Sequence, residues 1–275
     1  MKKLRKIIVG LMLLGVLIGV YSTYIEGKLL TSKKYGIEVN KNWKENIKVV
    51  QFTDTQLGEF FSLDQLQKVV DRINSEKADI VVFSGDLIDN ASKYEDLYKI
   101  SGVLAQIQAS KGKYAIYGNH DYGGGAVRYY NEIMEESGFK ILVNESDKIE
   151  LENTTINIFG LDDALMGDYN KEETMGGISN KDVNLLLIHE PDLIDDFKEY
   201  PIDLALAGHS HGGQVYIPFY GPIKTTALAE KYTKGFYKIH NENKGKLYVN
   251  SGLGNTKVPF RLFNIPQITV INLKI

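Results

Sequence analysis

Side chains that can bind metal ions recur at the ends of apolar segments in this sequence. Carboxylate, amide and imidazole groups suit Mn²⁺, Fe or Zn²⁺, and the chain has no cysteine to supply a thiolate. A single histidine at a strand end is usually structural, but four of the chain's five histidines lie in these motifs. The five motifs are DTQ with Asp54 and Gln56, GDLID with Asp86 and Asp89, GNHD with Asn119, His120 and Asp121, IHE with His189, and GHSH with His209 and His211. Together they predict a metal site in which one carboxylate can bridge two ions about 3.5–4 Å apart.

The elements that must position these motifs alternate between strands and helices in the first half of the chain. Short β-branched runs predict buried strands at 47–52, 79–86 and 113–121. Helical spacing of apolar residues predicts helices at 62–76, 93–109 and 126–138, the first with Ser62 as N-cap and the last ended by Gly138. This alternation indicates a parallel α/β sheet, whose sites form at the carboxyl ends of the strands.

The second half is richer in strands. Candidate strands, several of them separated by turn signals, lie at 140–143, 148–151, 155–161, 183–190, 203–209, 213–217, 235–239, 246–251 and 267–273. Because no linker divides residues 46–275, we predict one domain containing two sheets.

The N-terminal segment differs in composition from the rest. MKKLRK precedes an uncharged apolar run from Ile7 to Val20, which approaches the length of a membrane helix when residues 21–25 are added. Because no A-x-A-like cleavage site follows, we interpret residues 1–27 as an uncleaved membrane anchor rather than a cleaved signal peptide or a core helix. The basic head favours a cytoplasmic N-terminus and an extracellular domain, although Lys28, Lys33 and Lys34 on the other flank oppose this orientation. Residues 28–45 are predicted to form a polar tether.

Charge restricts the partners. Residues 31–275 contain 27 basic and 34 acidic residues, a net charge of −7. An acidic domain binds nucleic acid poorly without specific contacts, so no nucleic-acid partner is expected.

The order and spacing of the five motifs resemble the calcineurin-like metallophosphoesterase superfamily, whose pattern is D-x-H, G-D-x-x-D, G-N-H-[DE], H and G-H-x-H. The segments GHSHGGQVYIP and GLGNTKVPFRLFNIPQITVINL resemble its membrane-associated bacterial branch. The resemblance covers residues 46–275 and implies a four-layer αββα sandwich, in which two mixed β-sheets pack face to face between helices.

The resemblance also implies roles for the motif residues. A hydroxide that bridges two divalent metal ions would attack phosphorus in line. His120 would stabilise the transition state or protonate the leaving oxygen, and Asp89 would orient His120. Asp121 is assigned no catalytic role, and a capping or supporting role is the simpler interpretation. The implied ligands are Asp54, Gln56, Asp86 and His211 for the first metal, and Asp86, Asn119, His189 and His209 for the second.

Gln56 departs from the pattern, since the family usually has histidine there. An amide oxygen keeps the number of ligands and the charge, but an imidazole nitrogen binds Zn²⁺ better. We therefore expect weaker binding at the first metal and favour Mn²⁺ over Fe or Zn²⁺. The alternative hypothesis is a non-catalytic binding module with a degraded first metal site.

Several points stay open at this stage. Phosphomonoester and phosphodiester hydrolysis use the same ligands, and the anchor favours a lipid-linked or cell-wall-linked substrate. A monomer is expected. Asp162 and Asp163 either approach the site or lie in a solvated loop, and residues 216–222 either line a substrate groove or belong to core and rim. A β-lactamase-like H-x-H-x-D-H run and the G-x-S-x-G elbow of serine hydrolases are both missing from the sequence.

Overall fold

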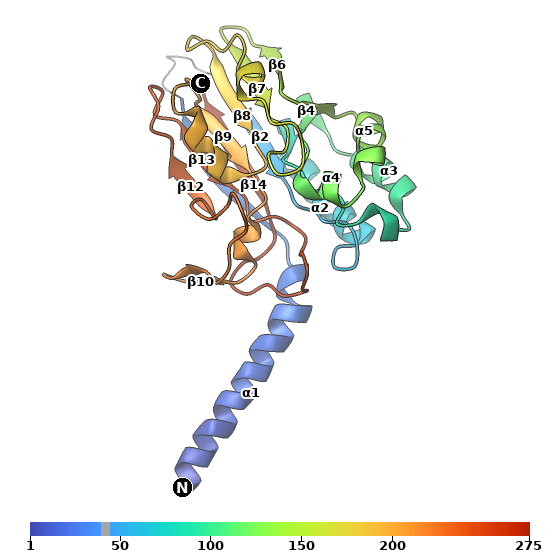
Figure 1. The fold of residues 1–275 in the computed structure, drawn as a ribbon, viewed down its shortest axis with the longest axis vertical. Helices are drawn as coiled ribbons and strands as arrows, with labels where there is room; N and C mark the ends of the chain where they lie inside the picture. The colour runs from blue at the N-terminus through green and yellow to red at the C-terminus, as the bar shows by residue number, and fades with distance from the viewer. Residues whose placement is uncertain (40–44) are drawn as a thin grey trace.

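The structure is a computed structural model that describes residues 1–39 and 45–275 (Figure 1). Its α-helices are α1 (Lys2–Tyr24), α2 (Leu63–Glu76), α3 (Ile100–Leu104), α4 (Asn119–Gly123), α5 (Val127–Glu136) and α6 (Lys171–Thr174). Its 3₁₀ turns are η1 (Glu26–Lys28), η2 (Ala91–Lys93), η3 (Leu97–Lys99), η4 (Pro191–Phe197) and η5 (His211–Gly213).

Two six-stranded mixed sheets form the centre of the fold. The first has the order β1 (Thr31–Glu38), β14 (Gln267–Lys274), β2 (Asn46–Phe52), β3 (Ala78–Phe83), β4 (Ala109–Ala115) and β5 (Lys140–Ile141). The second has the order β12 (Gly235–Lys238), β13 (Lys246–Val249), β9 (Leu204–Ala207), β8 (Val183–Leu187), β7 (Thr155–Gly160) and β6 (Glu145–Glu150). Within them, β2 to β5 run parallel, as do β13, β9, β8 and β7, whereas β14 is antiparallel to β2. A separate hairpin joins β10 (Tyr216–Ile217) to β11 (Gly221–Pro222).

The sheets pack face to face, as predicted. Because successive side chains of a strand point to opposite faces, Val49 of β2 joins the core between the sheets, while Val50 joins the core beneath α2, α3 and α5. Likewise Leu206 of β9 faces the inner core, and Ala205 faces an outer core that η4 covers with Phe197. The predicted four-layer architecture is confirmed, with only short helical segments in the fourth layer.

Local sequence explains the best-formed helix. The Ser62 side chain accepts a hydrogen bond from the Gln65 amide, and the Gln65 side chain accepts one from the Ser62 amide, which together make a capping box. The predicted helix at 126–138 also forms, and Gly138 ends it with a φ of +77°.

Two sequence-based predictions need correction. Residues 31–38 of the predicted tether form β1, which pairs in parallel with β14 at eight positions because the C-terminal strand offers its edge; residues 40–44 of that tether lie outside the described part of the chain. The predicted helix at 93–109 is divided into η2, η3 and α3. Gly102 lowers the helix propensity there, and tertiary packing buries Ile100 and Leu104 without a longer helix.

The helix α1 extends away from the sandwich, and its apolar side chains are exposed (Figure 1). It is long and apolar enough to cross a membrane, judged by its length and composition.

Candidate metal centre

The predicted site residues from both sheets meet at one edge of the sandwich. Asp54 and Asp86 follow β2 and β3 of the first sheet, and His189 and His209 follow β8 and β9 of the second. Asn119 begins α4, directly after the segment that continues β4. Backbone hydrogen bonds from Asp54 to Gly85 (3.0 Å) and from Gly208 to His189 (3.1 Å) hold neighbouring loops together.

Two groups of buried ligand atoms share one carboxylate. Asp86, His189 and His209 form one group, and Asp54, Asp86 and His211 form the other, with the ligand atoms of each group within 4.8 Å of one another. Asp86 lies in both groups, the position that a bridging carboxylate would occupy. The structure thus brings together the acidic and imidazole residues that the sequence analysis assigned to two metal ions.

Buried polar atoms without a partner test whether metal ions fit this site. Oε1 of Gln56, Oδ1 of Asn119 and Nε2 of His189 are buried and have no hydrogen-bond partner among the described residues. A buried polar atom normally finds a partner, since leaving it unsatisfied costs about 1–3 kcal/mol. These three atoms belong to predicted ligands, so the donor set fits two divalent cations.

The histidine rings are oriented by backbone carbonyl groups. Nδ1 of His189 lies 2.6 Å from the carbonyl of Ser84, Nε2 of His209 lies 2.8 Å from that of Ala227, and Nδ1 of His211 lies 3.2 Å from that of Gly254. A carbonyl only accepts, so each of these nitrogens carries the proton. The opposite nitrogen of each ring is therefore the one that can offer its lone pair to a metal once it is deprotonated, the usual arrangement in metal sites.

Burial also sets the charge of these side chains. It lowers the pKa of His209 to about 4 and that of His211 to about 3, so both rings are neutral at neutral pH. It raises the pKa of Asp54 to about 7, with a further rise from the neighbouring Asp86. Burial opposes charge on Asp86 and His189 as well, but their mutual attraction outweighs it, lowering the pKa of Asp86 and raising that of His189. Without a metal ion, the proton on His189 balances the charge of Asp86, and a bound cation would take the place of that proton.

The backbone at the site is unusual. Five of the predicted ligands have left-handed φ angles between 46° and 64°, namely Asp54, Gln56, Asp86, His209 and His211. Such conformations cost about 1–3 kcal/mol each for residues other than glycine and concentrate at functional sites. The chain therefore accepts backbone strain where it aims these side chains inward.

The predicted proton-handling pair is in place. Nδ1 of His120 lies 3.2 Å from Oδ1 of Asp89, and the His120 amide donates a hydrogen bond of 2.8 Å to Oδ1 of Asp86. His120 is therefore oriented by Asp89 and tied to the shared carboxylate.

Asp121, for which the sequence suggested a capping or supporting role, is a positioning residue that caps α4. Its buried carboxylate accepts hydrogen bonds of 2.9 Å from the amides of Asp86, Leu87 and Gly118. It thereby joins the loop after β3 to the start of α4. Its place directly after His120 was the signal available in the sequence.

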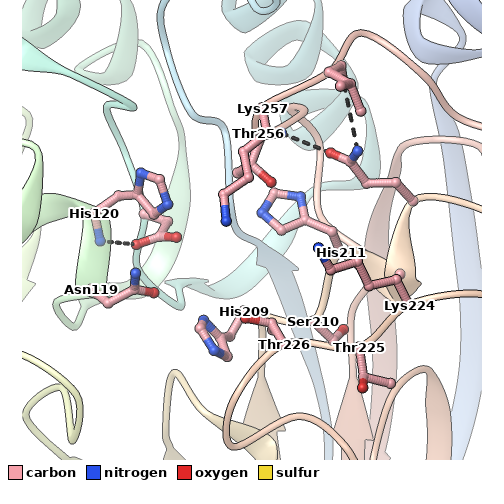
Figure 2. Close-up of a pocket in the computed structure, with 14 residues that line it drawn as sticks. Asn119, His120, His209, Ser210, His211, Lys224, Thr225, Thr226, Thr256 and Lys257 are labelled. Carbon is pink, nitrogen blue, oxygen red and sulfur yellow. Dashed lines mark hydrogen bonds between the residues drawn. The ribbon is translucent and has the colours of Figure 1, made fainter.

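A pocket of about 330 Å³ opens at the metal centre. Figure 2 shows Asn119 and His120 on one side and His209 and His211 on the other, with Lys257 extending between them from the rim. The remaining rim carries Lys224 and the hydroxyl groups of three threonines, Thr225, Thr226 and Thr256. Ammonium and hydroxyl groups around imidazoles favour an anionic ligand.

Two open points of the sequence analysis are resolved. Asp162 and Asp163 are buried rather than solvated, and they accept hydrogen bonds from Tyr122 (2.8 Å) and Met166 (2.6 Å) outside the pocket lining. The segment 216–222 neither lines the pocket nor joins the core, but forms the β10–β11 hairpin, whose strand residues are half-buried and whose tip at 218–220 is exposed.

Comparison with known proteins identifies the family. Residues 47–213 match the family described as calcineurin-like phosphoesterase. The chain belongs to this family. The metallophosphoesterase YkuE of Bacillus subtilis is 37% identical over 257 residues, covering 92% of this chain and 89% of YkuE.

Other calcineurin-like proteins are more distant. The UDP-2,3-diacylglucosamine pyrophosphatase LpxG of Chlamydia muridarum is 25% identical, with 93% of each chain covered. Among solved structures, the yellow lupin purple acid phosphatase PPD1 is 16% identical with a TM-score of 0.47, covering 84% of this chain and 55% of that one. As a calcineurin-like phosphoesterase, this chain is a metal-binding hydrolase of the phosphoesterase class.

Proposed function

We propose that this protein is a membrane-anchored phosphoesterase that hydrolyses a phosphomonoester or phosphodiester with two divalent metal ions. The observation that carries the proposal is the set of buried ligand atoms that have no hydrogen-bond partner in the described part of the chain, Oε1 of Gln56, Oδ1 of Asn119 and Nε2 of His189. The first ion would be held by Asp54, Gln56, Asp86 and His211, and the second by Asp86, Asn119, His189 and His209. When bound, the two ions polarise the phosphoryl oxygens and supply a water of lowered pKa.

Protein side chains would supply the proton transfer and the attraction of the substrate. His120, held by Asp89, donates its proton to the leaving oxygen or a hydrogen bond to the developing charge. Lys224 and Lys257 at the rim attract the anionic substrate. The intact His120–Asp89 pair supports an enzyme over the alternative of a non-catalytic binding module, because binding alone needs no proton donor.

Location and substrate complete the proposal. The length and composition of α1 support a single-pass membrane anchor. With the basic N-terminus in the cytoplasm, the domain faces the outside. The relative LpxG is named for a diacylated sugar nucleotide substrate, which supports a lipid-linked phosphoester here, with a cell-wall-linked one as the second candidate. We expect Mn²⁺ to be the preferred ion and a monomer to be the active form.

The test is metal-dependent turnover by the full chain in detergent. Metal-stripped protein is reconstituted with Mn²⁺, Fe²⁺ or Zn²⁺ and assayed against a panel of phosphomonoesters and phosphodiesters. We expect turnover that depends on added metal and is abolished in Asp86→Asn. Lack of metal-dependent turnover across the panel would favour the binding module, and activity that survives Asp86→Asn would reject the two-metal site.

A further inference from the structure

Exposed apolar side chains gather on two segments beside the end of α1. Phe219 is fully exposed at the tip of the β10–β11 hairpin, and it holds a left-handed φ of +66°, which is rare for a bulky residue. The hairpin and the segment 258–265 together form what we call the apolar surface, consisting of Phe219, Tyr220, Ile223, Val258, Phe263 and Ile265. Large exposed apolar patches mark surfaces that bind another apolar phase.

Hydrogen bonds fix this surface next to α1. The Arg261 amide donates to the carbonyl of Ser22 in the last turns of α1 (3.0 Å), and the Asn264 amide donates to the buried carboxylate of Glu26. The hairpin is bonded to the same segment, since the Tyr216 amide donates to the carbonyl of Leu262 (2.9 Å). Figure 1 shows β10 projecting beside the C-terminal end of α1, away from α3 and α5.

We infer that the apolar surface lies in the head-group layer of the same bilayer that α1 crosses. The inference rests on the membrane anchoring contained in the proposed function. Aromatic side chains such as Phe219 and Tyr220 favour the interface between hydrocarbon and water. Lys224 directly follows Ile223, Lys257 directly precedes Val258, and Lys28 ends η1 just after α1; ammonium groups attract anionic lipid head groups. A lipid bilayer, rather than a protein, therefore matches both the apolar and the charged parts.

The position of the pocket follows from this arrangement. Val258 belongs to the apolar surface and also lines the pocket, and Lys224 on the pocket rim directly follows Ile223. The mouth of the pocket thus opens at the level of the head groups. A phosphoester carried by a lipid can reach the metal centre without leaving the bilayer.

Depth-dependent fluorescence quenching tests the inference on the full chain. Trp43 is the only tryptophan, so Trp43→Phe provides a background into which Phe219→Trp or Tyr220→Trp is introduced. The protein is reconstituted into phosphatidylcholine–phosphatidylglycerol vesicles with or without lipids brominated near the head group. We expect bromine to lower the fluorescence of both reporters about twofold, because interfacial side chains lie about 5–10 Å into the head-group boundary.

Two further reporters serve as controls. Tyr98→Trp is matched in exposure, since Tyr98 and Tyr220 are 77% and 78% exposed, and it lies just before α3, away from α1; it should not be quenched. Leu14→Trp lies in α1 and should be quenched by lipids brominated deep in the acyl chain. Quenching at position 14 without quenching at 219 and 220 would overturn the interfacial placement but not the membrane anchor. A protein partner would then be the remaining occupant of the apolar surface. The lack of quenching at position 14 overturns the anchor and this inference with it.

Discussion

The side-chain amide of Gln56 donates a hydrogen bond of 2.6 Å to Oδ2 of Asp86, the carboxylate that both ligand groups share. The same oxygen lies 3.4 Å from Nε2 of His189. Gln56 therefore contacts the bridging position directly, while its own Oε1 is buried and has no partner among the described residues. In the proposed first metal site, this residue would therefore supply an amide oxygen where the family usually has an imidazole nitrogen.

Gln56→His should shift metal preference toward Zn²⁺. An imidazole is a better Zn²⁺ ligand than an amide oxygen, so we expect Zn²⁺ affinity at the first site to rise about tenfold relative to Mn²⁺. Isothermal titration of the metal-stripped protein measures this change. Gln67→His, on the exposed side of α2, is the control for adding a histidine. The prediction would be contradicted if the ratio of Zn²⁺ to Mn²⁺ affinity were the same in Gln56→His as in wild type.

His120→Ala should lower kcat by about 10²–10⁴-fold, the usual contribution of a general acid. If His120 protonates the leaving oxygen, the loss will be larger for alkyl phosphates than for p-nitrophenyl phosphate, whose leaving group needs no proton. Asp89→Asn should show the same pattern with a smaller loss, because the 3.2 Å contact orients the ring. The exposed His240→Ala is the control. A loss independent of the leaving group would assign His120 a purely electrostatic role.

Gly118→Ala should disrupt the metal centre by steric overlap. A Cβ at this position would lie 2.6 Å from the Asp86 amide nitrogen and 2.7 Å from a ring carbon of His189. We expect the unfolding free energy to fall by about 1–3 kcal/mol and metal affinity to fall with it. Gly102→Ala in α3, where no described atom outside the neighbouring backbone of the helix lies within 4 Å of the new Cβ, should leave metal affinity unchanged. Thermal unfolding and metal titration of both variants measure these changes. Wild-type metal affinity in Gly118→Ala would contradict the prediction.

Arg261→Leu should destabilise the protein and weaken the first metal site. This buried guanidinium, whose pKa burial lowers to about 10, donates to the carbonyls of Ser251 (3.0 Å), Asn264 (3.1 Å) and Gly254. Leaving the carbonyls of Ser251 and Asn264 without this donor should cost about 2–4 kcal/mol of unfolding free energy.

The effect on the metal site has a specific cause. Gly254 also accepts from the His211 ring, so losing Arg261 should disturb the orientation of His211. We expect lower metal affinity in Arg261→Leu and no change in Arg72→Leu on the solvent side of α2. Titration calorimetry measures the metal affinity. If Arg261→Leu were destabilised but bound both ions with wild-type affinity, the role of Arg261 in orienting His211 would be contradicted.

Lys234 should make stability depend on alkaline pH. Its burial and the nearby Arg261 lower its pKa to about 8. Between pH 8 and about 10.4 the unfolded chain binds this proton and the folded chain does not, so stability rises with pH across that window. Relative to Lys234→Met, wild type should gain about 1–2 kcal/mol of unfolding free energy from pH 7.5 to 10.5, since Lys234 is only partly buried. Chemical denaturation at both values measures the difference, and a constant difference would show that Lys234 titrates normally.

The sequence by itself determined the buried central strands and the identity of the chemical groups. Short β-branched runs such as 47–52, bounded by turn residues, favour buried strands, and Ser62 with Gln65 caps α2 through contacts three residues apart. Motif order then indicated that Asp54, Asp86 and His209 would meet at strand ends. Strand propensity and capping depend on residues close together in the chain, and the motifs are recognised by their order and spacing along it. All of this can be read from the sequence alone.

Tertiary structure decided what depends on partners distant in the chain. Residues 31–38 appear polar and tether-like, and only pairing with β14 more than 200 residues later makes them a strand. The ring nitrogen that each histidine offers is set by a carbonyl elsewhere, such as Ser84 for His189, and the roles of Asp121 and Arg261 come from amides and carbonyls brought together by folding. Residue type determines whether a side-chain atom can donate or accept a hydrogen bond. Which partner it bonds to, and hence how it is oriented, depends on the packing of segments that are distant in the chain.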